Sequence, residues 1–121
     1  MDQITLNRQI ALKWIEAFNE HDLEKLLALY ANDAVHYSPK LKIRQPETNG
    51  RVSGKPAMRS WWADAFTRLP SLKYILENLI VDDQQLLMEY LRKVDNEPDM
   101  MVAEILEMEN GLIIRSRVYH G

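Results

Sequence analysis

Residues 14–39, WIEAFNEHDLEKLLALYANDAVHYSP, predict two helices, a tight joint between them and the start of a β-strand. The first helix has its apolar residues at the spacing of one helical face, at Ile10, Ala11, Trp14, Ile15 and Phe18. Asp22 stands where the N-cap of a second, short helix belongs. The apolar face of that helix consists of Leu23, Leu26, Leu27 and Tyr30. Residues 34–38 then follow the two-residue alternation of a β-strand, and Pro39 ends this strand.

The rest of the chain divides into a polar loop, a third helix and four strands. The loop covers residues 40–53, with room for one short strand, and the third helix begins near Pro56 and ends at Pro70. The strands are expected at 72–81, 86–93, 100–109 and 112–120, and Asn110-Gly111 is a typical two-residue hairpin turn. Helices followed by an antiparallel meander predict an α+β fold, with three helices on the concave face of a curved sheet.

Length and composition limit the possible functions. A chain of 121 residues is expected to form a single domain over residues 1–121. We expect no membrane-spanning segment and no signal peptide, and the lack of cysteine agrees with a reducing compartment, so the predicted location is cytoplasmic. The net charge of -3, with scattered basic residues, gives no reason to expect nucleic acid as a partner. A small molecule is the expected ligand.

Several motifs carry a resemblance to a known family. They are W-I-E-A-F-N-x-H-D, L-Y-A-N-D-A-V-H-Y-S-P, G-x-x-x-G-K-x-A-M-R before the third helix, and the closing N-G-L-I-I-R-S-R-V-Y. In motifs and order of elements, nearly the whole chain resembles the nuclear transport factor 2-like superfamily, particularly SnoaL-like polyketide cyclases and ketosteroid isomerase-related proteins. The resemblance implies a cone-shaped, cystatin-like α+β barrel, a homodimer formed through the outer sheet face, and a pocket for a small hydrophobic ligand.

Two positions depart from the ketosteroid isomerase pattern. The family's aspartate base, which precedes a proline at the end of the first strand, corresponds to Ser38, and its oxyanion-binding tyrosine corresponds to Trp14. A serine hydroxyl is too weak a base without an activating partner. The Gly-Thr-His turn of many SnoaL-like cyclases is absent as well, since residues 93–96 read Lys-Val-Asp-Asn. Neither reaction is therefore expected in its usual form.

Two other residues are the candidate catalytic pair. Glu104 is the one acid in the alternating row Met100, Val102, Glu104, Leu106 and Met108, where burial would raise its pKa. His36 alternates with Ser38, so it faces the pocket if Ser38 does. The alternatives are that Glu104 lies at the sheet rim or in an ion pair, and that His36 is an ordinary core or surface residue.

The candidate ligand-binding residues are mostly aromatic. They are Trp14, Phe18, Tyr30, Ser38, Trp62, Tyr90 and His120, although aromatic residues at helical spacing are commonly core residues. We expect no cofactor and no metal site, because nucleotide motifs and His-x-x-x-His pairs are absent. The hypothesis is small-molecule binding with isomerase, cyclase or hydrolase activity. The alternative is a non-catalytic ligand-binding or dimerisation module, for which the cone would be plugged by its own side chains.

Overall fold

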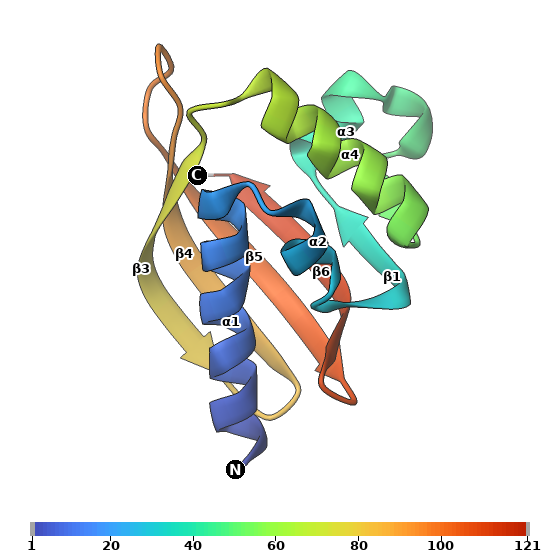
Figure 1. Ribbon diagram of the computed structural model, residues 1–121, viewed down its shortest axis with the longest axis vertical. Coiled ribbons are helices and arrows are strands. Elements are labelled where there is room, and N and C mark those ends of the chain that lie inside the picture. The colour runs from blue at the N-terminus through green and yellow to red at the C-terminus, as the bar shows by residue number, and fades with distance from the viewer. Residues whose placement is uncertain (1, 121) are drawn as a thin grey trace.

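The computed structural model describes residues 2–120 as one curved sheet with helices on its concave side (Figure 1). The helices are α1 (Gln3–Glu20), α2 (Leu23–Leu27), α3 (Pro39–Arg44), the 3-10 helix η1 (Pro46–Thr48) and α4 (Lys55–Arg68). The strands are β1 (Tyr30–Tyr37), β2 (Arg51–Ser53), β3 (Lys73–Val81), β4 (Gln85–Lys93), β5 (Met100–Glu109) and β6 (Leu112–His120). This arrangement confirms the predicted α+β class, with a sheet that is curved but not closed.

The strand order places the N-terminal and C-terminal strands side by side. The order is β2-β1-β6-β5-β4-β3, and all neighbours are antiparallel except β1 and β6, which are parallel. In this parallel pair, His36 lies opposite Ser116. Residues 80 positions apart in the sequence therefore become neighbours on the sheet.

Side-chain alternation decides which residues face the helices. Along β5, Val102, Glu104, Leu106 and Met108 are buried, while the residues between them lie on the outer face. On β6 the alternation is interrupted, because the register shifts opposite Glu107 and Met108. Ile113 consequently faces the core, although strict alternation would place it beside Arg115 and Arg117 on the outer face.

The joint between α1 and α2 is held to β3 by side-chain hydrogen bonds. His21 adopts a left-handed conformation (φ 53°) and ends α1. Asn19 donates from Nδ2 to the carbonyl oxygen of Tyr74 (2.9 Å) and accepts from the Tyr74 backbone N–H at Oδ1 (2.7 Å). His21 donates from Nε2 to the carbonyl oxygen of Leu72 (2.9 Å). The polar residues of the joint thus fix where β3 begins.

The second helix and the loop differ from the sequence prediction. The helix ends at Leu27, and Tyr30 begins β1, four residues before the predicted strand start. The predicted loop at 40–53 contains β2, the one short strand for which the prediction left room, but also η1 and most of α3. Pro39 ends β1 as expected, but its fixed φ also suits the first turn of a helix, so it begins α3. Four α-helices rather than three are therefore found in residues 2–120, and none of them is both long enough and apolar enough to span a bilayer.

The Asn19 contacts give a test of the fold. Replacing Asn19 with Ala leaves the backbone N–H and C=O of Tyr74 without their partners, so we expect a loss of about 1–3 kcal/mol in unfolding free energy. Asn32→Ala, at an exposed position, is the control and should change stability by less than about 0.5 kcal/mol. Urea unfolding followed by circular dichroism measures both. Equal stabilities of the two variants would show that the joint does not hold β3.

Candidate functional site

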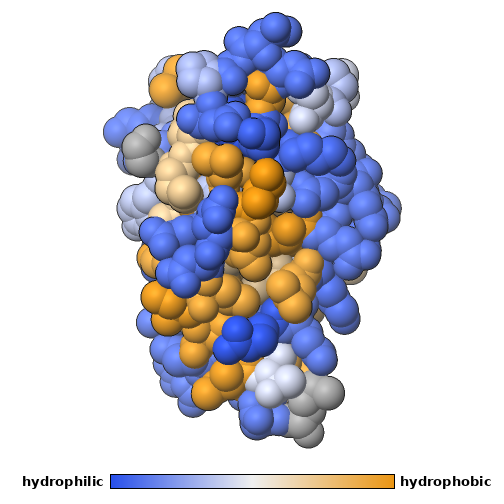
Figure 2. All heavy atoms as spheres, turned by 90° about the vertical axis from the view of Figure 1, so that its left-hand side faces the viewer, coloured by the Kyte–Doolittle hydropathy of each residue, from blue (hydrophilic) through white to orange (hydrophobic). Residues whose placement is uncertain are grey.

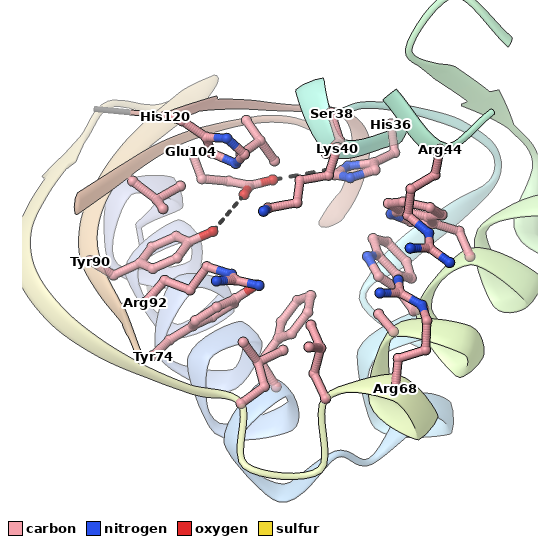
Figure 3. Close-up of a pocket in the computed structure, with 18 of the residues that line it drawn as sticks. His36, Ser38, Lys40, Arg44, Arg68, Tyr74, Tyr90, Arg92, Glu104 and His120 are labelled. Atoms are coloured by element: carbon pink, nitrogen blue, oxygen red, sulfur yellow. Dashed lines mark hydrogen bonds and ion pairs between the residues drawn. The ribbon is translucent and has the colours of Figure 1, made fainter. Parts of the chain in front are cut away.

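A cavity of about 350 Å³ lies between the concave face of the sheet and helices α1, α3 and α4 (Figure 3). Its floor comes from β1, β4, β5 and β6, and its walls come from the helices and the start of β3. The cone is therefore not plugged by its own aromatic side chains.

The structure places most of the predicted site residues in the wall of this cavity. Eight of them line it: Trp14, Phe18, His36, Ser38, Trp62, Tyr90, Glu104 and His120. Tyr30 does not; it is buried behind the wall, where its hydroxyl contacts Trp14 and Ser116. Ser38 stands at the N-cap position of α3 without a capping hydrogen bond from its side chain. The catalytic and binding roles of these residues remain predictions.

Glu104 is a buried carboxyl group at the cavity floor. Its side chain is 1 % exposed, and Oε1 accepts a hydrogen bond from the Tyr90 hydroxyl (3.1 Å). Its second oxygen, Oε2, is buried and has no hydrogen-bond partner within residues 2–120. Burial raises the pKa of this carboxyl to about 8, and the Tyr90 hydrogen bond opposes the rise in part. The carboxyl group of Glu104 is therefore protonated at neutral pH and loses its proton at slightly higher pH.

His36 lies beside Glu104 on the neighbouring part of the floor. Its Nδ1 is 2.7 Å from Ser116 Oγ and 4.0 Å from Glu104 Oε2 (Figure 3). Burial lowers the pKa of the imidazole to about 4. Because Glu104 is protonated below about pH 8 and His36 is neutral above about pH 4, the 4.0 Å contact joins two neutral groups at pH 7.

A chain of hydrogen bonds behind the wall determines which nitrogen of His36 carries the proton. The Trp14 indole N–H can only donate, and it donates to the Tyr30 hydroxyl (3.1 Å). The Tyr30 hydroxyl donates to Ser116 Oγ (3.1 Å). The Ser116 hydroxyl is fully buried and has no other acceptor among the described residues, so it donates to His36 Nδ1. In neutral His36 the proton is then on Nε2, for which the described residues supply no acceptor. His36 consequently offers the cavity an N–H donor.

Aromatic rings form most of the remaining wall. Trp14 packs against Phe18 (4.4 Å between ring centroids) and stacks on Tyr74 (5.7 Å). Tyr74 in turn lies 4.2 Å from Tyr90, and His36 lies 5.2 Å from Trp62. These rings give a ligand a flat apolar surface directly beside Glu104 and His36.

Four basic residues, which sequence reasoning missed, also line the cavity: Lys40, Arg44, Arg68 and Arg92. Arg92 follows Leu86, Met88 and Tyr90 on the inner face of β4, so the alternation that points to Glu104 would also have found it. Lys40 and Arg44 lie one helical turn apart on α3, which the sequence predicted as loop. Within residues 2–120, no three His, Cys, Asp or Glu side chains are placed to hold a metal ion.

The chain is similar to proteins of one family. A family model described as a SnoaL-like domain matches residues 11–116, whereas no curated protein matches. A solved SnoaL-like protein of unknown function from Burkholderia thailandensis is 20% identical, with a TM-score of 0.87 over 97% of this chain and 95% of that one. A proposed ketosteroid isomerase from Kribbella flavida is 19% identical (TM-score 0.81; 100% and 82% covered). A proposed polyketide cyclase from Sinorhizobium meliloti is also 19% identical (TM-score 0.77; 92% and 94%).

The pKa values of Glu104 and His36 predict how stability depends on pH. Between its ordinary value of 4.5 and about 8, Glu104 keeps a proton in the folded state that the unfolded chain has lost, so stability falls as pH rises. Between about 4 and 6.5 His36 acts in the opposite sense, because only the unfolded chain is protonated. We therefore expect the unfolding free energy to decrease from pH 6.5 to pH 8.

Urea unfolding at several pH values, compared between two variants, tests this expectation. Glu104→Gln should abolish the decrease, and Glu109→Gln, at an exposed position on the same strand, should retain it. A decrease of the same size in Glu104→Gln would show that another group causes it.

Proposed function

Because this chain belongs to the SnoaL-like domain family, we propose that it is a cofactor-independent enzyme that moves protons on a small, largely apolar carbonyl compound. The observation that carries the proposal is the carboxyl of Glu104, whose Oε2 has no partner within residues 2–120 although it is buried at a cavity floor. A buried polar atom without a partner costs stability, and such atoms are common where a substrate supplies the missing contact.

Each of the two candidate catalytic residues has a separate role in the proposed reaction. Ionised Glu104 takes a proton from the carbon next to the carbonyl group, and the electron pair of that C–H bond forms a carbon–carbon double bond. The carbonyl oxygen gains the negative charge and accepts a hydrogen bond from His36 Nε2. Where the substrate has a carbon–carbon double bond one position further along, the product of this step is a dienolate; protonated Glu104 then returns the proton to its γ-carbon, the double bond moves into conjugation with the carbonyl group, and an isomerisation is completed without any cofactor.

The surrounding contacts support these roles. Tyr90 holds Glu104 Oε1, so that Oε2 is the oxygen available for proton transfer. A neutral histidine with a lowered pKa is a suitable donor to a developing oxyanion, since it does not lose its proton to it at neutral pH. Ser38 and Trp14, which by resemblance correspond to the base and the oxyanion donor of ketosteroid isomerases, neither take up the transferred proton nor bind the oxyanion in this reaction.

Deuterium exchange tests the proposal without knowledge of the natural substrate. A panel of cyclic ketones and lactones is incubated with the enzyme in D₂O, and proton NMR measures exchange at the carbon next to the carbonyl. We expect enzyme-dependent exchange that Glu104→Gln reduces by about 10²–10⁴-fold, the usual contribution of a general base. His36→Asn should reduce it as well, whereas Glu109→Gln should leave it unchanged.

The pH dependence of the exchange rate tests whether ionised Glu104 acts as the base. If ionised Glu104 is the base, the rate rises with pH and levels off above about pH 8. Exchange that is equally fast in wild type, Glu104→Gln and His36→Asn would refute the proposed pair.

We also propose that the outer face of the sheet forms a homodimer, as the family resemblance implies. This face carries the apolar residues Ile75, Ile80, Leu87, Leu91, Met101, Ala103, Ile105 and Tyr119, with the hydrogen-bonded pair Asn78 and Glu89 among them. Figure 2, turned to the β3 side of Figure 1, shows apolar atoms gathered over much of that side. In a two-fold dimer this surface packs against the same surface of the second subunit. The apolar area of both subunits is thereby removed from water.

Light scattering coupled to size-exclusion chromatography measures the assembly. We expect about twice the chain mass of 14.2 kDa for wild type and a monomer for Met101→Asp, which places a charge on the proposed interface. Leu12→Asp, on the exposed side of α1, is the matched control and should remain a dimer. A monomeric wild type, or a dimeric Met101→Asp variant, would contradict the proposal.

A further inference from the structure

We propose that the substrate carries a carboxylate group, which Arg92 and Lys40 bind inside the cavity. This inference rests on the proposed function, which identifies the part of the substrate that reacts. It adds the chemical class of the substrate. The expected small hydrophobic ligand is thereby specified further as a largely apolar molecule that carries an acid group.

Arg92 is a buried cation with donors to spare. It is 6 % exposed, lies on the inner face of β4 and lines the cavity. Its Nη1 donates to Glu97 Oε1 (2.9 Å), which uses one of the five N–H groups of the guanidinium. Glu97 also lines the cavity, with its side chain 40% exposed, so its carboxylate occupies one side of the guanidinium. The cavity side of the guanidinium is suited to bidentate binding of a carboxylate.

Lys40 directs a second positive charge to the same part of the cavity. Its half-buried side chain comes from α3, across the cavity from β4, and Figure 3 shows its ammonium group pointing toward the guanidinium of Arg92. The described residues provide Lys40 with no ion pair within 4.0 Å. Both cations, after the effect of burial itself, lower the pKa of His120, which agrees with their convergence at this point. Glu97 is close to both cations, because the hydrogen bond from Arg92 and the charges of Arg92 and Lys40 lower its pKa, and it balances one of the two positive charges. An anion placed between Arg92 and Lys40 would balance the other.

The other two basic residues that line the cavity, Arg44 and Arg68, also carry positive charge. Arg68 donates to Asp64 (2.6 Å), and Arg44 lies 4.0 Å from the same carboxylate. Asp64 is thus the partner of Arg44 and Arg68, and Glu97 is the partner of Arg92, so two carboxylates stand against four cations. Glu104 adds no charge at neutral pH because its pKa is about 8. An excess of positive charge at a cavity attracts and retains anions.

The sheet register relates this position to the proposed reacting centre. Met88 of β4 lies opposite Glu104, and Arg92 is four residues further along the same strand. That interval corresponds to about 13 Å of extended backbone, part of which the long arginine side chain spans. A molecule with one or two rings would then place its acid group at Arg92 and Lys40, its rings on Trp14 and Tyr74, and its reacting carbon near Glu104.

Binding of two probes of the same shape tests the charge requirement. Isothermal titration calorimetry compares 1-naphthoate with the neutral 1-naphthamide, and quenching of the cavity tryptophans Trp14, Trp61 and Trp62 gives an independent readout. We expect 1-naphthoate to bind at least about tenfold more tightly, and its affinity to fall with added NaCl while that of the amide does not. Equal affinities, or no effect of salt on naphthoate binding, would overturn the proposal.

Variants locate the bound carboxylate. Lys40→Met and Arg92→Gln should each lower naphthoate affinity by about tenfold and leave amide binding unchanged. Lys42→Met is the matched control, because Lys42 is on the same helix but is exposed and does not line the cavity. If Arg92→Gln fails to fold, Lys40→Met and the salt series decide the question. Wild-type naphthoate affinity in Lys40→Met would overturn the assignment.

The binding test and the exchange test fail independently. A wild-type enzyme that exchanges protons but binds both probes equally would overturn the carboxylate site alone. A wild-type protein that prefers naphthoate but exchanges no protons would overturn the acid/base proposal alone. Glu104→Gln should keep the preference for naphthoate, since it replaces a carboxyl that is already neutral at pH 7.

Discussion

The parallel pairing of β1 with β6 is the constraint on which the rest of the site depends. It joins the strand that follows α2 to the last strand of the chain, and its register places His36 directly opposite Ser116. The same pairing allows Tyr30, at the start of β1, to reach Ser116 and to connect it to Trp14 of α1. A shift of β1 by one residue would turn His36 to the outer face and break the chain of hydrogen bonds that sets its tautomer.

Burial has opposite effects on the two groups at the cavity floor but leaves both of them uncharged. It raises the pKa of Glu104 to about 8 and lowers that of His36 to about 4, so no ion pair forms between them over the range from about pH 4 to pH 8. The charges of the cavity belong instead to the cations Lys40, Arg44, Arg68 and Arg92 and to Glu97, which pairs with Arg92. In the proposed reaction the neutral pair Glu104 and His36 performs the chemistry, and the cationic side chains around this pair hold the ligand.

The sequence predicted the structure best in segments that show a single regular pattern of side chains. Alternation along β5 correctly predicted that Glu104 shares the buried face with Val102 and Leu106. Prediction failed where two signals overlapped, because Pro39 both ends β1 and begins α3. Alternation also does not hold along all of β6, where a register shift moves Ile113 to the core. Arg92 could have been found by alternation, whereas the contacts of Tyr30 and Ser116 depend on a long-range pairing that no local pattern contains.

The amide of Asn19 has a consequence beyond the joint in which it lies. β3 is an outermost strand of the sheet, and a strand in that position exposes backbone donors and acceptors to which another extended chain can add. Asn19 offers Tyr74 one acceptor and one donor, the same pair of groups that a further strand would offer. One side chain thus imitates a neighbouring strand at the start of β3, and it protects the protein against edge-to-edge aggregation at that point.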